Sequence, residues 1–267
     1  MALELDFECE PAPGRPLGCV ELWAGNERAH RHQEMAGLEA DAIALPSGSR
    51  RGGDLCALFS CDREAVARVV LADVVGHGYS ASLVAAHIHR LLHKYRDVPA
   101  TGALLEALND AFTLEQAPDQ PLKLTTVVSA RFERATGEFQ YTYAAHPRML
   151  LWRARQARLR ELGRDLEGFP LGFIAGERYQ ERSERLEAGD MILAFSDGIT
   201  EVKSPSGERM NPGKLVELAD GIIRTLPQPA RVHDLAEHLF AAVQRYHGSE
   251  EFDDDVTLLT LRRMGAE

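Results

Sequence analysis

The order of strand-like and helix-like segments constrains the fold of this 267-residue chain more than any other feature of the sequence. Short apolar or alternating segments come first, and a pair of helical patterns follows them. A run of strand-like segments, a second helical pair and a last strand complete the chain. Strands that cluster in this way, without regular alternation with helices, are typical of antiparallel sheets covered by helices. The sequence therefore predicts an α+β fold.

The expected elements are bounded by turn residues and by changes in hydrophobic periodicity. Strands are predicted at residues 18–24, 38–45, 55–59, 68–72, 124–132, 139–144, 149–153, 191–195 and 256–261. The three strands between residues 124 and 153 are expected to form an antiparallel meander. Helices are predicted from a cap at Ser80 to about residue 92, and at residues 103–114, 213–225 and 232–246. The polar residues 26–35 are expected to separate the first two strands.

Charge and hydropathy exclude several classes of function. The chain has 30 Lys and Arg residues against 41 Asp and Glu, a net charge of −11, which disfavours a general electrostatic grip on nucleic acid. No apolar run approaches the roughly 18 to 20 residues that span a membrane, and the N-terminus has neither a basic start nor an apolar stretch. We therefore expect a cytoplasmic protein that binds neither nucleic acid nor membranes.

Four aspartates, Asp54, Asp73, Asp197 and Asp254, stand at predicted strand ends beside turn residues. Each one alone is more often a turn or capping residue. Because antiparallel neighbours bring the end of one strand to the beginning of another, however, the four carboxylates are able to converge at one rim. Clustered carboxylates repel one another, and hard divalent cations relieve this repulsion. Oxygen ligands favour Mg²⁺ or Mn²⁺ over zinc, and two such ions activate water for attack at phosphorus.

A series of short motifs, in order along residues 38–263, resembles the PPM family of metal-dependent, protein phosphatase 2C-like serine/threonine phosphatases. The resemblance is to its bacterial stage II sporulation E-type branch. The motifs are Gly52-Gly53-Asp54, Val70-Leu71-Ala72-Asp73-Val74-Val75-Gly76-His77-Gly78, Thr125-Thr126, Ala144-Ala145-His146-Pro147, Pro170-Leu171-Gly172, Gly189-Asp190, Ser196-Asp197-Gly198-Ile199-Thr200-Glu201 and Asp254-Asp255-Val256-Thr257.

The resemblance implies an αββα four-layer sandwich over residues 38–263, preceded by an N-terminal arm or extra strand at residues 1–37. It also implies two Mn²⁺ or Mg²⁺ ions. Asp73 would bridge both ions, Asp54 and the Val74 carbonyl would hold one, and Asp197 and Asp254 the other. A metal-bridging hydroxide would then attack a phosphoserine or phosphothreonine directly.

The resemblance further implies a phosphorylated regulator of the anti-sigma-factor antagonist type as substrate, in a bacterial partner-switching pathway. A homodimer is also compatible with the sequence. Two alternatives stay open. One is a catalytically idle module that holds a phosphoprotein, suggested by Ala57, which stands where the family often has a second acid. The other is a hydrolase of a small phosphate ester.

Other polar residues have weaker assignments. His77 is a candidate general acid because imidazole titrates near working pH, although it is more simply a turn residue. Arg50 and Arg51 are candidates for binding the substrate phosphate, with a solvated loop pair as the equal alternative. His146 is interpreted as structural. No role follows from the sequence for the polar cluster that contains His30 and His32.

Overall fold

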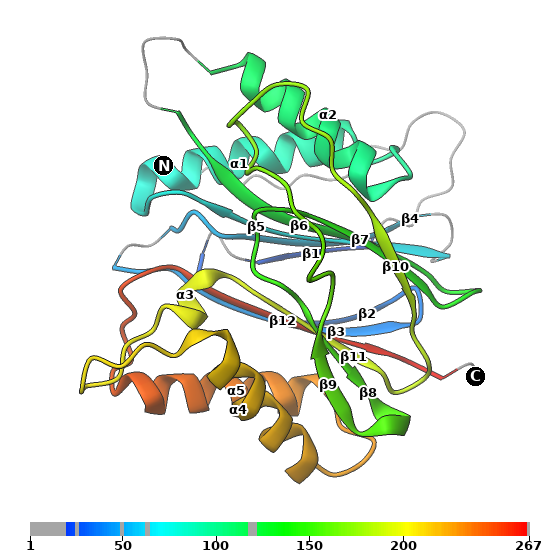
Figure 1. Ribbon diagram of the computed structural model, residues 1–267, viewed down its shortest axis with the longest axis vertical. Coiled ribbons are helices and arrows are strands. Elements are labelled where there is room, and N and C mark those ends of the chain that lie inside the picture. The colour runs from blue at the N-terminus through cyan, green and yellow to red at the C-terminus, as the bar shows by residue number, and fades with distance from the viewer. Residues whose placement is uncertain (1–19, 25–26, 49–50, 62–64, 117–121, 266–267) are drawn as a thin grey trace.

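The protein is a four-layer sandwich in which two antiparallel sheets face each other between two pairs of helices (Figure 1). The computed structural model describes residues 20–24, 27–48, 51–61, 65–116 and 122–265. Within these residues each sheet has six strands. The predicted α+β class and the αββα arrangement are confirmed.

The first sheet has the strand order β1-β4-β5-β6-β7-β10. Its central strand carries the continuous apolar run, whose alternate residues face opposite ways. Val69 and Leu71 pack into the core between the sheets, whereas Val70 and Ala72 pack under the helices. The strands are β1 (Val20–Ala24), β4 (Leu55–Cys61), β5 (Val66–Val74), β6 (Thr125–Glu133), β7 (Glu138–Ala144) and β10 (Arg182–Arg185).

The second sheet has the strand order β2-β3-β12-β11-β8-β9. Alanines of β3 face the core between the sheets, while Ile43 of the same strand packs toward the opposite helices. The strands are β2 (Ala29–Met35), β3 (Leu38–Leu45), β12 (Val256–Arg263), β11 (Met191–Phe195), β8 (Leu150–Arg153) and β9 (Arg158–Glu161).

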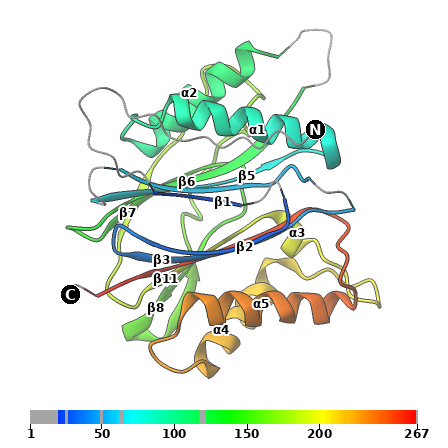
Figure 2. The same ribbon diagram turned by 180° about the vertical axis from the view of Figure 1, so that it is seen from behind.

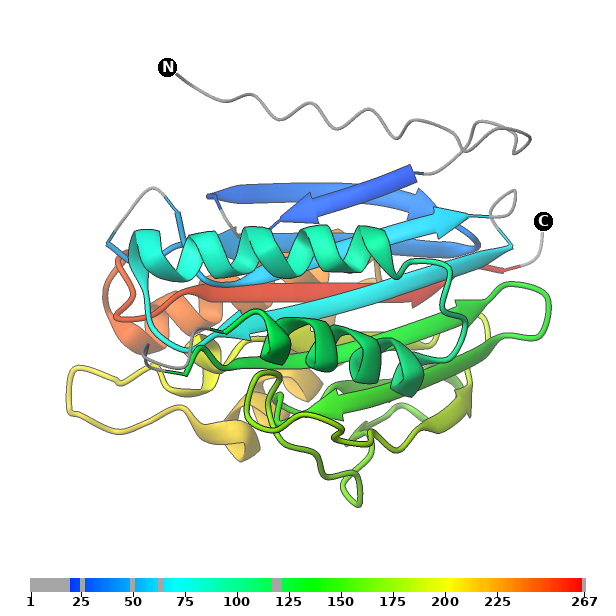
Figure 3. The same cartoon turned by 90° about the horizontal axis from the view of Figure 1, so that it is seen from above.

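Amphipathic helices close both outer faces (Figures 2 and 3). The first sheet is covered by α1 (Gly78–Lys94) and α2 (Thr101–Leu114), which bury residues such as Ile88 and Leu105. The second is covered by α4 (Asn211–Thr225) and α5 (Val232–His247), which bury residues such as Leu235. The short elements are α3 (Asp197–Thr200) and the 3₁₀ helix η1 (Ala154–Gln156). None of the helices in the described part of the chain is long and apolar enough to cross a membrane.

Three local predictions are wrong. Residues 26–35 do not simply separate two strands, because β2 forms there as the polar edge of the second sheet, paired with β3. The predicted meander is also interrupted. After β7 the backbone of Ala145 adopts a positive φ of 56°, and the chain crosses to the second sheet, where β8 pairs with β11. Helix α1 begins at Gly78, and its cap position is His77, three residues before the predicted cap at Ser80.

The predicted N-terminal arm lies partly outside the described residues, which begin at residue 20. Its described part contributes one strand to each sheet, since β1 pairs with β4 and β2 pairs with β3.

Candidate metal centre

The four predicted aspartates lie where strands of both sheets begin or end. Asp54 directly precedes β4, and Asp73 is the next-to-last residue of β5. The antiparallel pairing of Leu55 with Ala72 places these two aspartates at the same end of the first sheet. Asp197 follows β11 as the first residue of α3, and Asp254 stands two residues before β12.

The second pair is brought together in the same way. The Ser196 N–H donates to the Thr257 carbonyl at 3.0 Å, which continues the pairing of β11 with β12 up to the site. Both sheet ends therefore meet at one rim of the sandwich, as the sequence predicts for antiparallel neighbours.

The four carboxylates lie close enough to affect one another's ionisation. Burial raises the pKa of Asp73 well above its usual range, and the charges of Asp54, Asp197 and Asp254 raise it further. Burial also raises the pKa of Asp254, and Asp197 adds to the effect. The structure thus brings together residues that are up to 200 positions apart in the chain (254 − 54).

Asp54 is the most deeply buried member, with 1% of its side chain exposed. Burial raises its pKa to about 7. The hydroxyls of Ser196 and Thr257 lower it in part, and the charges of Asp255 and Asp197 raise it again. Within the described part of the chain, neither hydroxyl forms a hydrogen bond of good geometry with Asp54, and both carboxylate oxygens are buried without a hydrogen-bond partner. An isolated buried carboxylate is costly in free energy, so Asp54 requires a proton or a cation.

The donor set fits hard divalent cations. All four side chains offer oxygen, the ligand atom that Mg²⁺ and Mn²⁺ prefer. The backbone of Gly53, next to Asp54, also lies close to the Val74 carbonyl, because a Cβ built on Gly53 would lie 3.1 Å from the Val74 oxygen. The Val74 carbonyl, predicted as a ligand, is therefore near the aspartates. Asp54, Asp73, Val74, Asp197 and Asp254 are therefore able to hold such ions, with the orphaned oxygens of Asp54 as the structural observation in favour.

Asp255 holds the loop that carries Asp54. Its carboxylate is buried and accepts hydrogen bonds from the backbone N–H groups of Gly53 at 2.5 Å and Ser47 at 2.7 Å. A Cβ at Gly52 would lie 2.6 Å from the Asp255 Oδ2 atom, so glycine is required at this close approach. This role of Asp255 is not predictable from the sequence, because a run of three aspartates by itself indicates a solvated loop.

The other residues predicted to belong to the site, His77, Arg50 and Arg51, precede or follow the aspartates in the chain. His77 is exposed at the N-cap of α1, and its side chain makes no capping hydrogen bond. Arg51 pairs with Glu27 at 3.1 Å and lines a cavity of about 890 Å³, together with Arg28, Pro46 and Phe252. None of the four aspartates is among the described residues that line this cavity. Arg50 lies outside the described residues.

His146 is buried behind the centre. Its Nδ1 atom forms a hydrogen bond of 2.7 Å with the Thr126 hydroxyl, and Thr126 is the register partner of Asp73. Burial lowers the pKa of His146 to about 3, although the nearby backbone of Phe195 opposes the shift. The ring is therefore neutral at ordinary pH. Its hydrogen bond to Thr126 helps to fix the first residues of β6, which pair with the last residues of β5.

The same sandwich is found in solved phosphatase domains. The chain is 28% identical to the RsbU and RsbW domains of Rv1364c from Mycobacterium tuberculosis, with a TM-score of 0.72, over 86% of this chain and 61% of that one. The catalytic domain of the serine/threonine protein phosphatase PstP, solved with two manganese ions, shares the fold at 19% identity and a TM-score of 0.58. That match covers 85% of this chain and 99% of PstP. Facing sheets, outer helix pairs and an acidic rim thus define a PP2C-like domain of the PPM class.

Sequence comparison places the chain within this class. The family model described as stage II sporulation protein E (SpoIIE) matches residues 63–264, and the chain belongs to this family. The phosphoserine phosphatase RsbU of Bacillus subtilis (strain 168) is 27% identical over 237 residues, which are 86% of this chain and 64% of RsbU. The chain therefore spans slightly less than two thirds of the length of RsbU and of the Rv1364c structure.

Proposed function

We propose that this chain is a Mn²⁺- or Mg²⁺-dependent protein serine/threonine phosphatase. The observation that carries the proposal is the buried Asp54 carboxylate, whose oxygens lack hydrogen-bond partners, among three further aspartates. Two relatives support the class of reaction, since RsbU is a phosphoserine phosphatase and PstP was solved with two manganese ions.

The proposed ligand sets follow the two sheet ends. Asp54 and the Val74 carbonyl, from the first sheet, would hold one ion, and Asp197 and Asp254, from the second, would hold the other. Asp73 lies near members of both sets and would bridge them. Divalent ions bound here would lower the pKa of water and polarise phosphoryl oxygens.

The protein's own residues would position the substrate. Asp254 is exposed, which leaves the rim open to a phosphorylated side chain. His77, exposed at the start of α1, would donate a proton to the leaving serine or threonine oxygen. Arg51, on the loop before Asp54, would contact the phosphate by charge-assisted hydrogen bonds after releasing Glu27.

A folded phosphoprotein fits the surface next to the rim. Val75, Tyr79 and Leu83 expose 65%, 70% and 54% of their surface on the turn after Asp73 and on α1. Large exposed apolar side chains that lie together are typical of protein contact sites. The substrate we propose is a phosphorylated regulator of the anti-sigma-factor antagonist type, in the cytoplasm. The relatives RsbU and the RsbU–RsbW protein of Mycobacterium support a partner-switching pathway.

The test is phosphate release from a phosphoserine peptide and from a phosphorylated antagonist protein, with and without Mn²⁺. We expect Mn²⁺-dependent release that Asp73→Asn abolishes. The matched control is Asp220→Asn on α4, which removes a partly exposed aspartate paired with Arg224 and should leave turnover unchanged. Equal turnover in wild type and Asp73→Asn would contradict the proposal.

The same assay separates the alternatives. A catalytically idle module would bind the phosphoprotein but release no phosphate at any Mn²⁺ concentration. A hydrolase of small phosphate esters would prefer p-nitrophenyl phosphate or a metabolite over the phosphoprotein in kcat/KM.

A further inference from the structure

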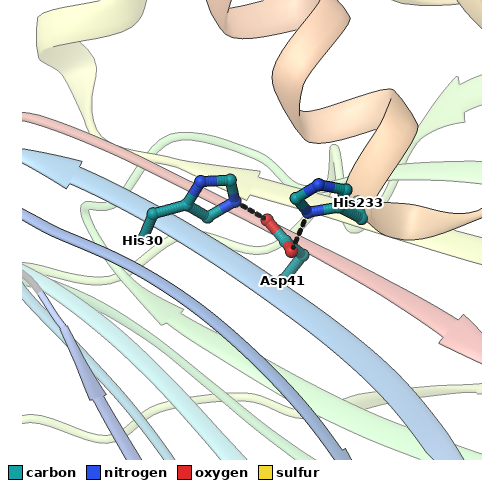
Figure 4. Close-up of side chains that lie close together, drawn as sticks. All are labelled: His30, Asp41 and His233. Atoms are coloured by element: carbon teal, nitrogen blue, oxygen red, sulfur yellow. Dashed lines mark hydrogen bonds and ion pairs between the residues drawn. The ribbon is translucent and has the colours of Figure 1, made fainter.

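A second cluster of metal-ligating side chains lies on the outer face of the second sheet, away from the aspartate rim. It contains His30 and His32 of β2, Asp41 of β3 and His233 at the start of α5. Figure 4 shows His30, Asp41 and His233. Asp41 stands four residues before the end of β3 and pairs with Thr260, well inside β12. Its neighbour on the same face, Ile43, packs toward the helices, so Asp41 lies under α5. We call this group the His-Asp cluster.

The Asp41 carboxylate is the centre of the His-Asp cluster. Its side chain is 0% exposed. The Oδ1 atom lies 2.8 Å from Nε2 of His30, and the Oδ2 atom lies 2.9 Å from Nδ1 of His233 and 3.4 Å from Nδ1 of His32. Three imidazoles from two segments about 200 residues apart therefore point a ring nitrogen at one buried carboxylate (His30 and His233 in Figure 4).

The spacing of these atoms matches a tetrahedral metal site. Ligand atoms that lie about 2.0–2.1 Å from a tetrahedral ion are about 3.3 Å from one another. The nitrogen-to-oxygen distances in the cluster are 2.8 to 3.4 Å, and the ligand atoms of His30, Asp41 and His233 all lie within 4.8 Å of one another.

The surroundings favour a cation. His233 Nε2 lies 3.4 Å from Glu237 Oε1, the arrangement in which a second carboxylate orients a ligating imidazole. The hydrogen bond to Asp41 and the charges of Asp41, Glu237 and Asp234 raise the pKa of His233. The rings of His30 and His233 stack with centroids 5.0 Å apart, so both imidazoles lie close to the same carboxylate.

We propose that His30, His32, Asp41 and His233 form a binding site for a transition-metal ion of the Zn²⁺ type, separate from the hard-cation centre at the aspartate rim. Three imidazole nitrogens and one carboxylate oxygen suit Zn²⁺ or Co²⁺, whereas Mg²⁺ and Mn²⁺ prefer oxygen. The bound ion would join the edge strand β2 to β3 and α5. The proposal is independent of phosphatase activity.

The test uses the full chain with Asp73→Asn and excess Mg²⁺, so that the aspartate rim does not compete for the probe. Co²⁺ titration, followed by visible absorption, should give one tetrahedral site. Replacing His30 or His233 with alanine should weaken Co²⁺ binding at least about tenfold, since each removes a ligand. Because His30 is exposed on an edge strand, His30→Ala does not threaten folding.

The controls are His238→Ala, the next histidine along α5, and His93→Ala, whose Nε2 atom lies 3.1 Å from that of His89 on α1. Both should retain the Co²⁺ spectrum. Saturating Zn²⁺ should raise the melting temperature by about 5 °C or more, and His30→Ala should remove most of this rise. The proposal is overturned if no tetrahedral Co²⁺ spectrum forms, if it survives His233→Ala at full strength, or if His93→Ala abolishes it.

Discussion

Two buried carboxylates, Asp54 and Asp41, show two different environments within one sandwich. Both side chains are almost fully withdrawn from water. Asp54 lies at the rim among other aspartates, and its oxygens have no hydrogen-bond partner. Asp41 lies on the outer face of the second sheet, and imidazoles approach both of its oxygens.

The negative charge of Asp54 needs a cation from outside the protein, whereas the protein's own imidazoles already compensate the charge of Asp41. Burial and neighbouring charges raise the pKa of Asp54 to about 7, so its ionised form requires cations from solution. The imidazoles around Asp41 offer protons in the absence of metal and nitrogen ligands in its presence. Divalent ions bound at the first site should therefore affect both activity and stability, whereas an ion bound at the second should affect stability alone.

The largest expected effect is on catalysis. Asp54→Asn should lower kcat/KM at least about 100-fold, which corresponds to roughly 3 kcal/mol of lost transition-state stabilisation. His233→Ala should leave kcat/KM within about threefold at a temperature where both variants are folded. Steady-state assays of both variants in Mn²⁺ measure this difference. Similar losses of kcat/KM in Asp54→Asn and His233→Ala would contradict the assignment of catalysis to the aspartate rim alone.

The next effect concerns stability without metal. In EDTA, Asp41→Ala should lower the free energy of unfolding by about 3 kcal/mol, because it removes charge-assisted hydrogen bonds that are buried. Asp54→Asn should be neutral or stabilising by about 1 kcal/mol, since it removes an uncompensated charge. Urea denaturation at pH 8 measures both changes. A destabilising Asp54→Asn would mean that its carboxylate already has a partner.

The stability of the protein should also depend on the metal bound at the aspartate rim. At Mn²⁺ concentrations about 100 times the dissociation constant, binding to the aspartate rim should stabilise the fold by about 2.7 kcal/mol. EDTA should reverse the gain, and Asp73→Asn should show little of it. Thermal melts across a Mn²⁺ series provide the measurement, with His30→Ala as the variant expected to respond like wild type.

A smaller effect, on stability at acid pH, is expected from buried His146. Its pKa of about 3 in the folded protein lies below the value of about 6.5 in the unfolded chain, so the folded state binds fewer protons between these values. This residue therefore costs stability as pH falls from about 6.5 toward 3, by at most about 1.4 kcal/mol per pH unit. Denaturation at several pH values should show a shallower acid loss in His146→Gln than in wild type. Parallel curves would contradict the burial of a neutral ring.

Much of the fold was predictable because the strands and helices carry strong local patterns. The run at Val69–Ala72 and the helical faces appear where expected, and the antiparallel sheets follow from their order. The convergence of Asp54 with Asp73 was predictable because each stands at a strand end. Their roles as metal ligands stay a prediction.

Other features depend on tertiary contacts that local patterns do not contain. Strand β2 lacks an apolar alternation because it is an exposed edge strand, held by pairing with β3. His233 approaches His30 and Asp41 only after α5 packs on the second sheet, so no short motif joins them. The anchoring role of Asp255 depends on the backbone of a loop about 200 residues away.

The most direct measurement of the central claim is anomalous diffraction from crystals soaked in Mn²⁺. The account predicts strong manganese peaks within coordination distance of Asp54, Asp73, Asp197 and Asp254, and their loss in Asp73→Asn crystals. Well-ordered aspartates without a manganese peak between them would contradict it.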